Sequence, residues 1–291
     1  MKKILNKPLS TLARLFLGKG IIDKYFPFLN SIFKIVYVYL QPNEVKIVNL
    51  PNDIKLAVNT RDTGVGIQLL VNNKYEVAQT DLFLKVLKKG DTFVDVGANI
   101  GYYSVLASKN IGKDGEVYSF EPDKHNILLL QKNIALNNVA NVKIESKAVS
   151  DKNGLIEFAE DKYNKGESSI RHNKDSTYQV ESVALDSYFN NTKTIDVLKM
   201  DIEGAEINAV QGAKNIIKLS KSLHLFIELN PPSLLNYGHK REELIALLRS
   251  LNFKLDAIID DSRNEVLPYS TYNLQRVLDH VTFCNLYAYR T

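Results

Sequence analysis

Short apolar runs alternate with amphipathic stretches through most of the chain from residue 92 onward. Candidate strands lie at 92–96, 116–120, 142–146, 195–201, 223–229, 254–260 and 281–290. Candidate helices lie at 102–110, 123–137, 205–217 and 241–251. Strands that alternate with helices of this length are typical of a parallel sheet with helices on both faces. We therefore expect an α/β fold with a doubly wound sheet.

Two shorter segments precede this alternation. The runs 44–50 and 54–59 flank Pro51-Asn52-Asp53, which predicts a β-hairpin, and a helical pattern near residues 75–88 ends before Gly90. The pattern predicts an N-terminal helical arm over residues 1–43 and one domain over 44–291. In that domain the hairpin occupies 44–59 and the core about 75–291.

The N-terminal arm carries most of the excess positive charge. Residues 1–40 hold seven Lys and Arg residues against one Asp, whereas the remaining chain holds 30 Lys and Arg against 32 Asp and Glu. The main domain is therefore slightly acidic, which argues against a nucleic-acid partner.

Residues 21–40 are apolar, but charged residues and Pro27 interrupt them too often for a membrane span. No cleavage site of the secretory type follows. We expect two short amphipathic helices, which either pack on the main domain or lie on an anionic membrane surface. The predicted location is cytoplasmic, with membrane association through the arm as the second possibility.

The stretch "FVDVGANIGYYS", residues 93–104, joins the first strand of the expected sheet to its first helix. Ligands of such sheets bind beyond the carboxyl ends of the strands. Gly97 and Gly101 let the backbone approach a ligand, and a helix N-terminus offers free N–H groups. This bend is the candidate cofactor cradle.

The residues of the bend distinguish two cofactors. A dinucleotide fingerprint is G-x-G-x-x-G, but Asn99 stands where the second glycine should be. Asp95 and Asn99 suit a ligand that carries an ammonium and a carboxylate, as S-adenosylmethionine does. Glu121 ends the next strand, 20 residues beyond Gly101, where a carboxylate can accept hydrogen bonds from both ribose hydroxyls.

A second polar stretch, "VLKMDIEGAE", ends the fourth strand of the expected sheet at Asp201. This edge faces the same crevice, so Asp201 is the first candidate for a base that takes a proton from an acceptor hydroxyl. Alternatively, the clustered carboxylates Asp201, Glu203 and Glu206 hold a divalent cation such as magnesium, with Glu228 at the end of the fifth strand as a further ligand. For Glu206, at a helix start, capping or surface solvation is the preferred interpretation.

The histidines offer second-rank candidates for the base. His172 lies in a polar stretch and His239 precedes a helix; both can accept a proton near neutral pH. No histidine pair has metal-ligand spacing on a helix, which argues against zinc. The polar segment 160–176 is either a surface loop or a sugar-binding lid. Cys284 is expected to be a small buried side chain.

The chain resembles the FkbM-type methyltransferases over approximately residues 75–260. The resemblance rests on "VDVGANIG", on Glu121-Pro122 at the strand end and on "KMDIEGAE". It implies a Rossmann-like sheet of seven strands with S-adenosylmethionine-dependent O-methylation, often of sugars or glycosylated natural products. The proposed cofactor site comprises Asp95, Gly97, Asn99, Gly101, Glu121 and Pro122, with Ala148 and Asp151 bordering the adenine.

Two alternatives belong to other functional classes. A nicotinamide-dependent oxidoreductase would use the same bend, although Asn99 argues against it. A non-catalytic protein that binds membrane surfaces is suggested by the basic arm. The acceptor and the oligomeric state do not follow from the sequence.

Overall fold

The computed structural model describes residues 42–159 and 177–291, and these residues fall in two compact units. The first described unit comprises residues 42–76. In it, β1 (Val45–Leu50) and β2 (Ile54–Asn59) pair antiparallel, as predicted, and α4 (Val65–Asn72) packs on β2. Asn52 and Asp53 in the connecting turn have positive φ, a conformation that these two residue types tolerate better than most.

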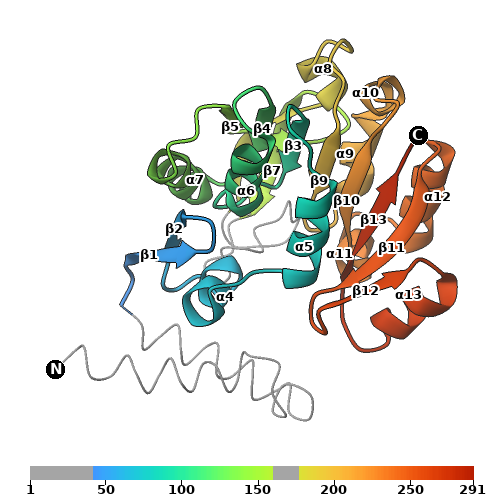
Figure 1. The fold of residues 1–291 in the computed structure, drawn as a ribbon. Coiled ribbons are helices and arrows are strands. Elements are labelled where there is room, and N and C mark those ends of the chain that lie inside the picture. Colours follow the sequence, from blue (N-terminus) through green and yellow to red (C-terminus); the bar gives the residue numbers. More distant parts are fainter. Residues whose placement is uncertain (1–41, 160–176) are drawn as a thin grey trace. The chain divides into compact units, whose positions relative to one another are not determined.

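The second unit, from residue 77, contains an eight-stranded sheet with the order β12-β11-β13-β10-β9-β3-β4-β5 (Figure 1). Its strands are β3 (Thr92–Val96), β4 (Glu116–Phe120), β5 (Val142–Glu145), β9 (Val197–Met200), β10 (His224–Leu229), β11 (Lys254–Asp260), β12 (Glu265–Pro268) and β13 (Cys284–Tyr289). The central strands β5, β4, β3, β9 and β10 pair parallel, and the order reverses between β3 and β9. The fold is the expected Rossmann-like α/β fold.

The strand count and the direction of the last strand differ from expectation. All seven predicted strands form, but β13 runs antiparallel to both β10 and β11. An eighth strand, β12, pairs with β11 as a hairpin whose turn contains Asn264 at φ 55°. Its short sequence, EVLP, is too brief and too exposed to show a clear strand period.

Helices flank the sheet in the second unit: α5 (Val77–Val86), α6 (Tyr102–Ile111), α7 (Lys124–Leu136), α8 (Leu185–Tyr188), α9 (Glu206–Gln211), α10 (Lys214–Leu219), α11 (Pro231–Asn236), α12 (Arg241–Ser250) and α13 (Thr271–Leu278). The single helix predicted over 205–217 is wrong, because α9 and α10 are separate. The Asp186 carboxylate accepts hydrogen bonds from the N–H groups of Asn215 and Ile216 and so begins a new helix there. In the break, a Cβ at Gly212 would overlap the carbonyl oxygen of Ser150.

The two faces of the sheet differ in chemistry. One face carries Val94, Leu198 and Ile227, which share a hydrophobic cluster with side chains of α9, α12 and α13. On the other face Phe93 and Phe226 meet Phe83 of α5, with ring centroids 5.0 and 5.6 Å away. Because side chains alternate along a strand, the residues two positions beyond these rings point to this second face as well. That face becomes polar toward the carboxyl ends of the strands.

A second, three-stranded sheet was not predicted. It comprises β6 (Ala148–Val149), β7 (Gly154–Ala159) and β8 (Thr177–Val183), in the order β6-β8-β7. Residues 160–176, which include His172, lie outside the described residues, as does the arm up to residue 41. Across the described part of the chain, no helix combines the length and apolar character that a membrane crossing requires.

Candidate active site

The bend between β3 and α6 has the backbone conformation that its residues favour. Gly97, Asn99 and Gly101 have φ values of 83°, 51° and 85°, in the left-handed region that glycine and asparagine adopt most readily. A Cβ at Gly97 would overlap the carbonyl oxygen of Asp201, and a Cβ at Gly101 would overlap the side chain of Leu130. The glycines therefore permit close packing within the protein as well as access to the bend.

Glu121, at the end of β4, lies beside this bend. Its side chain is buried and accepts hydrogen bonds from the N–H groups of Asn99 and Asp123, each at 2.8 Å. Burial, together with the charge of the neighbouring Asp123, raises the pKa of Glu121 to about 7, although the hydrogen bonds that it accepts oppose this rise. The Asn126 side chain is a third hydrogen-bond partner, and the lone-pair position that remains on the carboxylate can accept a hydrogen bond from a ribose hydroxyl.

Asp95 lies in β3, 1% exposed. Its Oδ2 accepts a hydrogen bond of 2.6 Å from Ser104 of α6, and Ser119 of β4 donates to Ser104 in turn. Burial raises the pKa of Asp95, while the charge of Lys199 lowers it. Its Oδ1 is buried and has no hydrogen-bond partner among the described residues. A buried oxygen of this kind fits a ligand with hydrogen-bond donors, such as S-adenosylmethionine.

The other predicted cofactor residues take different positions. The Asn99 side chain accepts the N–H of Ile100, so it stabilises the bend locally. Pro122 follows Glu121 and is half-buried. Ala148 packs with Phe158 and Val180 in the small sheet. Asp151 is exposed and accepts a hydrogen bond from Ser150. The roles of Ala148 and Asp151 beside the adenine stay predictions.

Two residues near Glu121 were missed. Asp123 caps α7 by accepting the N–H groups of His125 and Asn126, and the hydroxyl of Tyr178 lies 3.5 Å from its other oxygen. Strand β8 therefore reaches the end of β4. An Asp before an apolar helical run is a recognisable N-cap, so Asp123 could have been predicted. The position of Tyr178 could not, because pairing between strands far apart in the sequence leaves no local pattern.

Asp201 follows β9 directly, and its amide donates to the carbonyl oxygen of Val96 in β3. Its Oδ2 lies 2.8 Å from Nζ of Lys199, whose buried ammonium lies 4.8 Å from the ring centre of Tyr103. The Asp201 side chain is 23% exposed, so its carboxylate is accessible from solvent. The main chain of Asp201 therefore contacts the glycine bend, and Lys199 orients its carboxylate.

Glu206 has a structural role. The side chain is fully buried, which rules out surface solvation, and Oε1 accepts the N–H groups of Ile202 and Gly204 at 3.1 and 3.2 Å. Burial raises the pKa of Glu206 to about 7. By closing the turn at 202–204, Glu206 fixes the direction in which Glu203 leaves the strand end.

Three carboxyl groups gather at this strand edge. A carboxylate oxygen from each of Asp201, Glu203 and Glu228 lies within 4.8 Å of the other two. Glu228 is buried, and burial together with Glu203 and Asp201 raises its pKa well above the usual range. All three were expected at this strand edge, but the sequence does not show the turn that aims Glu203, which has a positive φ of 55°.

The remaining candidates are less well placed. His239 lies between α11 and α12, where its Nδ1 contacts Oε2 of Glu243 at 3.1 Å. Cys284 is buried as expected, and burial raises the pKa of its thiol to about 12. The thiol is therefore protonated at neutral pH and unsuited to nucleophilic chemistry.

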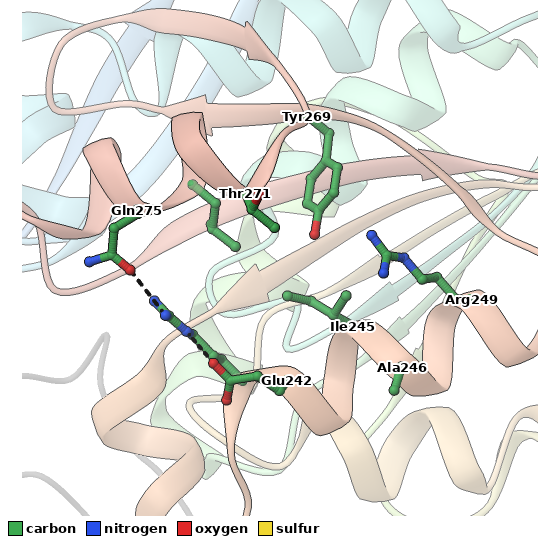
Figure 2. A pocket seen from close by; sticks show the side chains of 9 residues that line it. Glu242, Ile245, Ala246, Arg249, Tyr269, Thr271 and Gln275 are labelled. Atoms are coloured by element: carbon green, nitrogen blue, oxygen red, sulfur yellow. Dashed lines mark hydrogen bonds and ion pairs between the residues drawn. The ribbon is translucent and has the colours of Figure 1, made fainter.

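A separate pocket of about 320 Å³ lies between α12, α13 and the segment after β12 (Figure 2). At one end Arg241 contacts Glu242 and Gln275, and at the other Arg249 lies 5.9 Å from the ring centre of Tyr269. None of its nine lining residues is among the candidate cofactor or acceptor residues. The pocket is therefore not part of the candidate site.

Comparison with solved structures finds similar folds at low identity. A methyltransferase from Aquifex aeolicus described as S-adenosylmethionine-dependent is 14% identical, with 77% of this chain and 93% of that chain covered and a TM-score of 0.44. An FkbM methyltransferase from Methylobacillus flagellatus is 16% identical, with 76% and 52% covered and a TM-score of 0.42. A TehB-like methyltransferase from Corynebacterium glutamicum is 10% identical, with 77% and 92% covered and a TM-score of 0.43.

The sequence itself matches one protein family. No curated protein matches the chain. Residues 95–255, more than half of the chain, match the methyltransferase FkbM domain. The match begins at Asp95 and includes Glu121, Asp201 and Glu228, the residues that the fold brings to one edge of the sheet. The chain belongs to the FkbM methyltransferase family and is an S-adenosylmethionine-dependent methyltransferase.

Proposed function

We propose that this methyltransferase acts on a hydroxyl group of a sugar, a glycan or a glycosylated small molecule. The observation that carries the proposal is the contact between Gly97 and the main-chain carbonyl group of Asp201, because it makes a residue with a partly exposed carboxylate the neighbour of the cofactor cradle. The resemblance to FkbM-type enzymes supports a sugar as the acceptor.

The residues suit binding of the cofactor at the bend. Glu121 would accept hydrogen bonds from the ribose, and the buried oxygen of Asp95 would accept one from a donor of the ligand. S-adenosylmethionine supplies a methyl group on a positively charged sulfur. The protein positions the acceptor and assists removal of its hydroxyl proton.

Methyl transfer to oxygen requires removal of a proton. A sugar hydroxyl is a weak nucleophile at neutral pH, so a group that takes its proton as the new bond forms accelerates the reaction. The acceptor oxygen forms a bond to the methyl carbon, the carbon–sulfur bond breaks with its electron pair left on sulfur, and the hydroxyl proton is released. Lys199 holds one oxygen of Asp201, which leaves the other to assist this release, either directly or through a bound cation.

The test is an activity assay on a panel of sugars and glycosylated lipids, with S-adenosylhomocysteine as the measured product. Asp201→Asn keeps the size of the side chain but removes its charge. We expect turnover to fall by roughly 100- to 10,000-fold, as for loss of a positioned base, while cofactor affinity changes far less.

Asp114→Asn is the matched control, because Asp114 is exposed and precedes the amino end of β4. It should keep the activity of the unmodified protein. Full turnover in Asp201→Asn would remove Asp201 from the chemistry and make His172 and His239 the next residues to test.

A further inference from the structure

One oxygen of the buried Glu228 carboxyl group lacks the hydrogen bond that such an atom normally has. The side chain is 3% exposed, and its Oε2 has no hydrogen-bond partner within the described parts of the chain. A buried carboxylate oxygen without a partner destabilises a fold, since it loses water and gains nothing in return. Glu228 shares a sheet face with Phe226, whose ring packs against Phe83.

The direction of Glu228 is set by the sheet register. Lys199 pairs with Phe226 across β9 and β10, so Asp201 and Glu228 each lie two residues further toward the carboxyl edge on the same face. There a carboxylate oxygen of Glu228 lies within 4.8 Å of oxygens from both Asp201 and Glu203. The unpartnered group therefore belongs to a cluster of three converging carboxylates.

Among the described residues, the charges that act most strongly on Glu228 are mostly negative. They are those of Glu203, Asp201 and Glu206, against the ammonium of Lys199. That ammonium already pairs with Oδ2 of Asp201. Repulsion between the carboxylates remains, and a divalent cation among them would offset it.

We propose that Asp201, Glu203 and Glu228 bind one divalent cation of the Mg²⁺ or Mn²⁺ type, with water completing its coordination. Three carboxylates without nitrogen or sulfur ligands suit these hard cations rather than zinc. Asp201 and Glu203 are only half-buried, so the site opens on the side from which an acceptor would approach. The catalytic use of the cation, to make an acceptor hydroxyl more acidic, rests on the proposed function. The binding site itself does not.

The experiment measures Mn²⁺ binding to the full chain after chelator treatment, without cofactor or acceptor. Electron paramagnetic resonance follows free Mn²⁺, and excess Mg²⁺ tests competition. We expect one Mn²⁺ per chain, displaced by Mg²⁺. Loss of an outer-shell partner of a metal typically costs roughly 10- to 100-fold in affinity, so loss of a direct ligand in Glu203→Gln or Glu228→Gln should weaken binding by at least about tenfold.

Glu157→Gln is the control, because it makes the same change on the exposed face of β7 and should bind Mn²⁺ like the unmodified protein. Glu203 is half-buried, so Glu203→Gln carries the test if the buried Glu228→Gln fails to fold. Failure of the unmodified protein to bind Mn²⁺, or equal binding by Glu203→Gln, overturns the proposal. Hydroxyl methylation without Mn²⁺ binding would leave the proposed function standing. If the protein binds Mn²⁺ but methylates none of the hydroxyl acceptors tested, the result would support the cation site and not the proposed function.

Discussion

Gly97 and Asp201 lie in direct contact where β3 and β9 end, so closely that a Cβ on Gly97 would overlap the carbonyl oxygen of Asp201. These two strands are neighbours at the point where the order of the sheet reverses. The contact couples the two informative stretches of the sequence, the glycine bend and the acidic strand end. It makes the cofactor cradle and the candidate proton acceptor parts of one site.

The contact predicts a large stability difference between two glycine substitutions. Gly97→Ala and Gly90→Ala both place alanine at a positive φ, which costs roughly 1–2 kcal/mol. Gly90 has open space around it, whereas Gly97 does not. Overlap should add roughly 1–3 kcal/mol to the loss of unfolding free energy in Gly97→Ala. Urea denaturation checks this, and equal losses in the two variants would mean that the bend and β9 do not pack as described.

Glu121→Ala should weaken binding of S-adenosylmethionine. Hydrogen bonds to a charged group contribute roughly 1.5–3 kcal/mol, so affinity should fall by about ten- to a hundredfold, as measured by calorimetric titration. Glu116→Ala is a matched control, because Glu116 begins the same strand and is partly exposed at its other end. Unchanged affinity in a folded Glu121→Ala protein would contradict its assignment to the cofactor site.

The raised pKa of Glu121 predicts a pH-dependent affinity. With a pKa of about 7, roughly one-tenth of Glu121 is ionised at pH 6 and nine-tenths at pH 8. Ribose hydroxyls donate to the ionised form. Protonation of Glu121 should therefore make the Kd for the cofactor up to about tenfold larger at pH 6 than at pH 8. Glu121→Gln should remove this part of the pH dependence. If the two proteins show the same pH profile, Glu121 does not titrate in the binding site.

The same pKa predicts an effect on the cofactor-free fold. The folded-state value of about 7 exceeds the ordinary value of 4.5, so the stabilising contribution of protonated Glu121 is present below pH 4.5 and is lost as the pH rises through 7. Thermal unfolding at a series of pH values, compared with Glu121→Gln, measures this loss. The opposite result, in which the unmodified protein becomes more stable than Glu121→Gln as the pH rises, would contradict the prediction.

The basic arm carries a separate prediction. If residues 1–40 bind anionic membranes, their deletion should abolish salt-sensitive sedimentation with anionic vesicles and leave cofactor affinity unchanged. Neutral vesicles serve as the control. An insoluble or unfolded deletion variant would show instead that the arm packs on the domain.

The sequence predicted the central sheet well because its signals are local. The β3 and β4 segments are short apolar runs, and the glycine bend follows from residue types that tolerate positive φ. The small sheet and its Tyr178 were missed because pairing between distant strands leaves no periodic pattern. Glu203 was expected in the acidic cluster, but only the folded turn, closed by Glu206, shows where its carboxylate points.

Methylation of a hydroxyl group can be tested by following the methyl group itself. The protein is incubated with S-adenosylmethionine labelled with carbon-13 at the methyl position and with a panel of sugars and glycosylated lipids, and the products are analysed by NMR and mass spectrometry. We expect the label to appear as an O-methyl ether on one acceptor, and Asp201→Asn to lower the rate at which this ether forms. Transfer to nitrogen or carbon, or transfer unaffected by Asp201→Asn, would contradict this expectation.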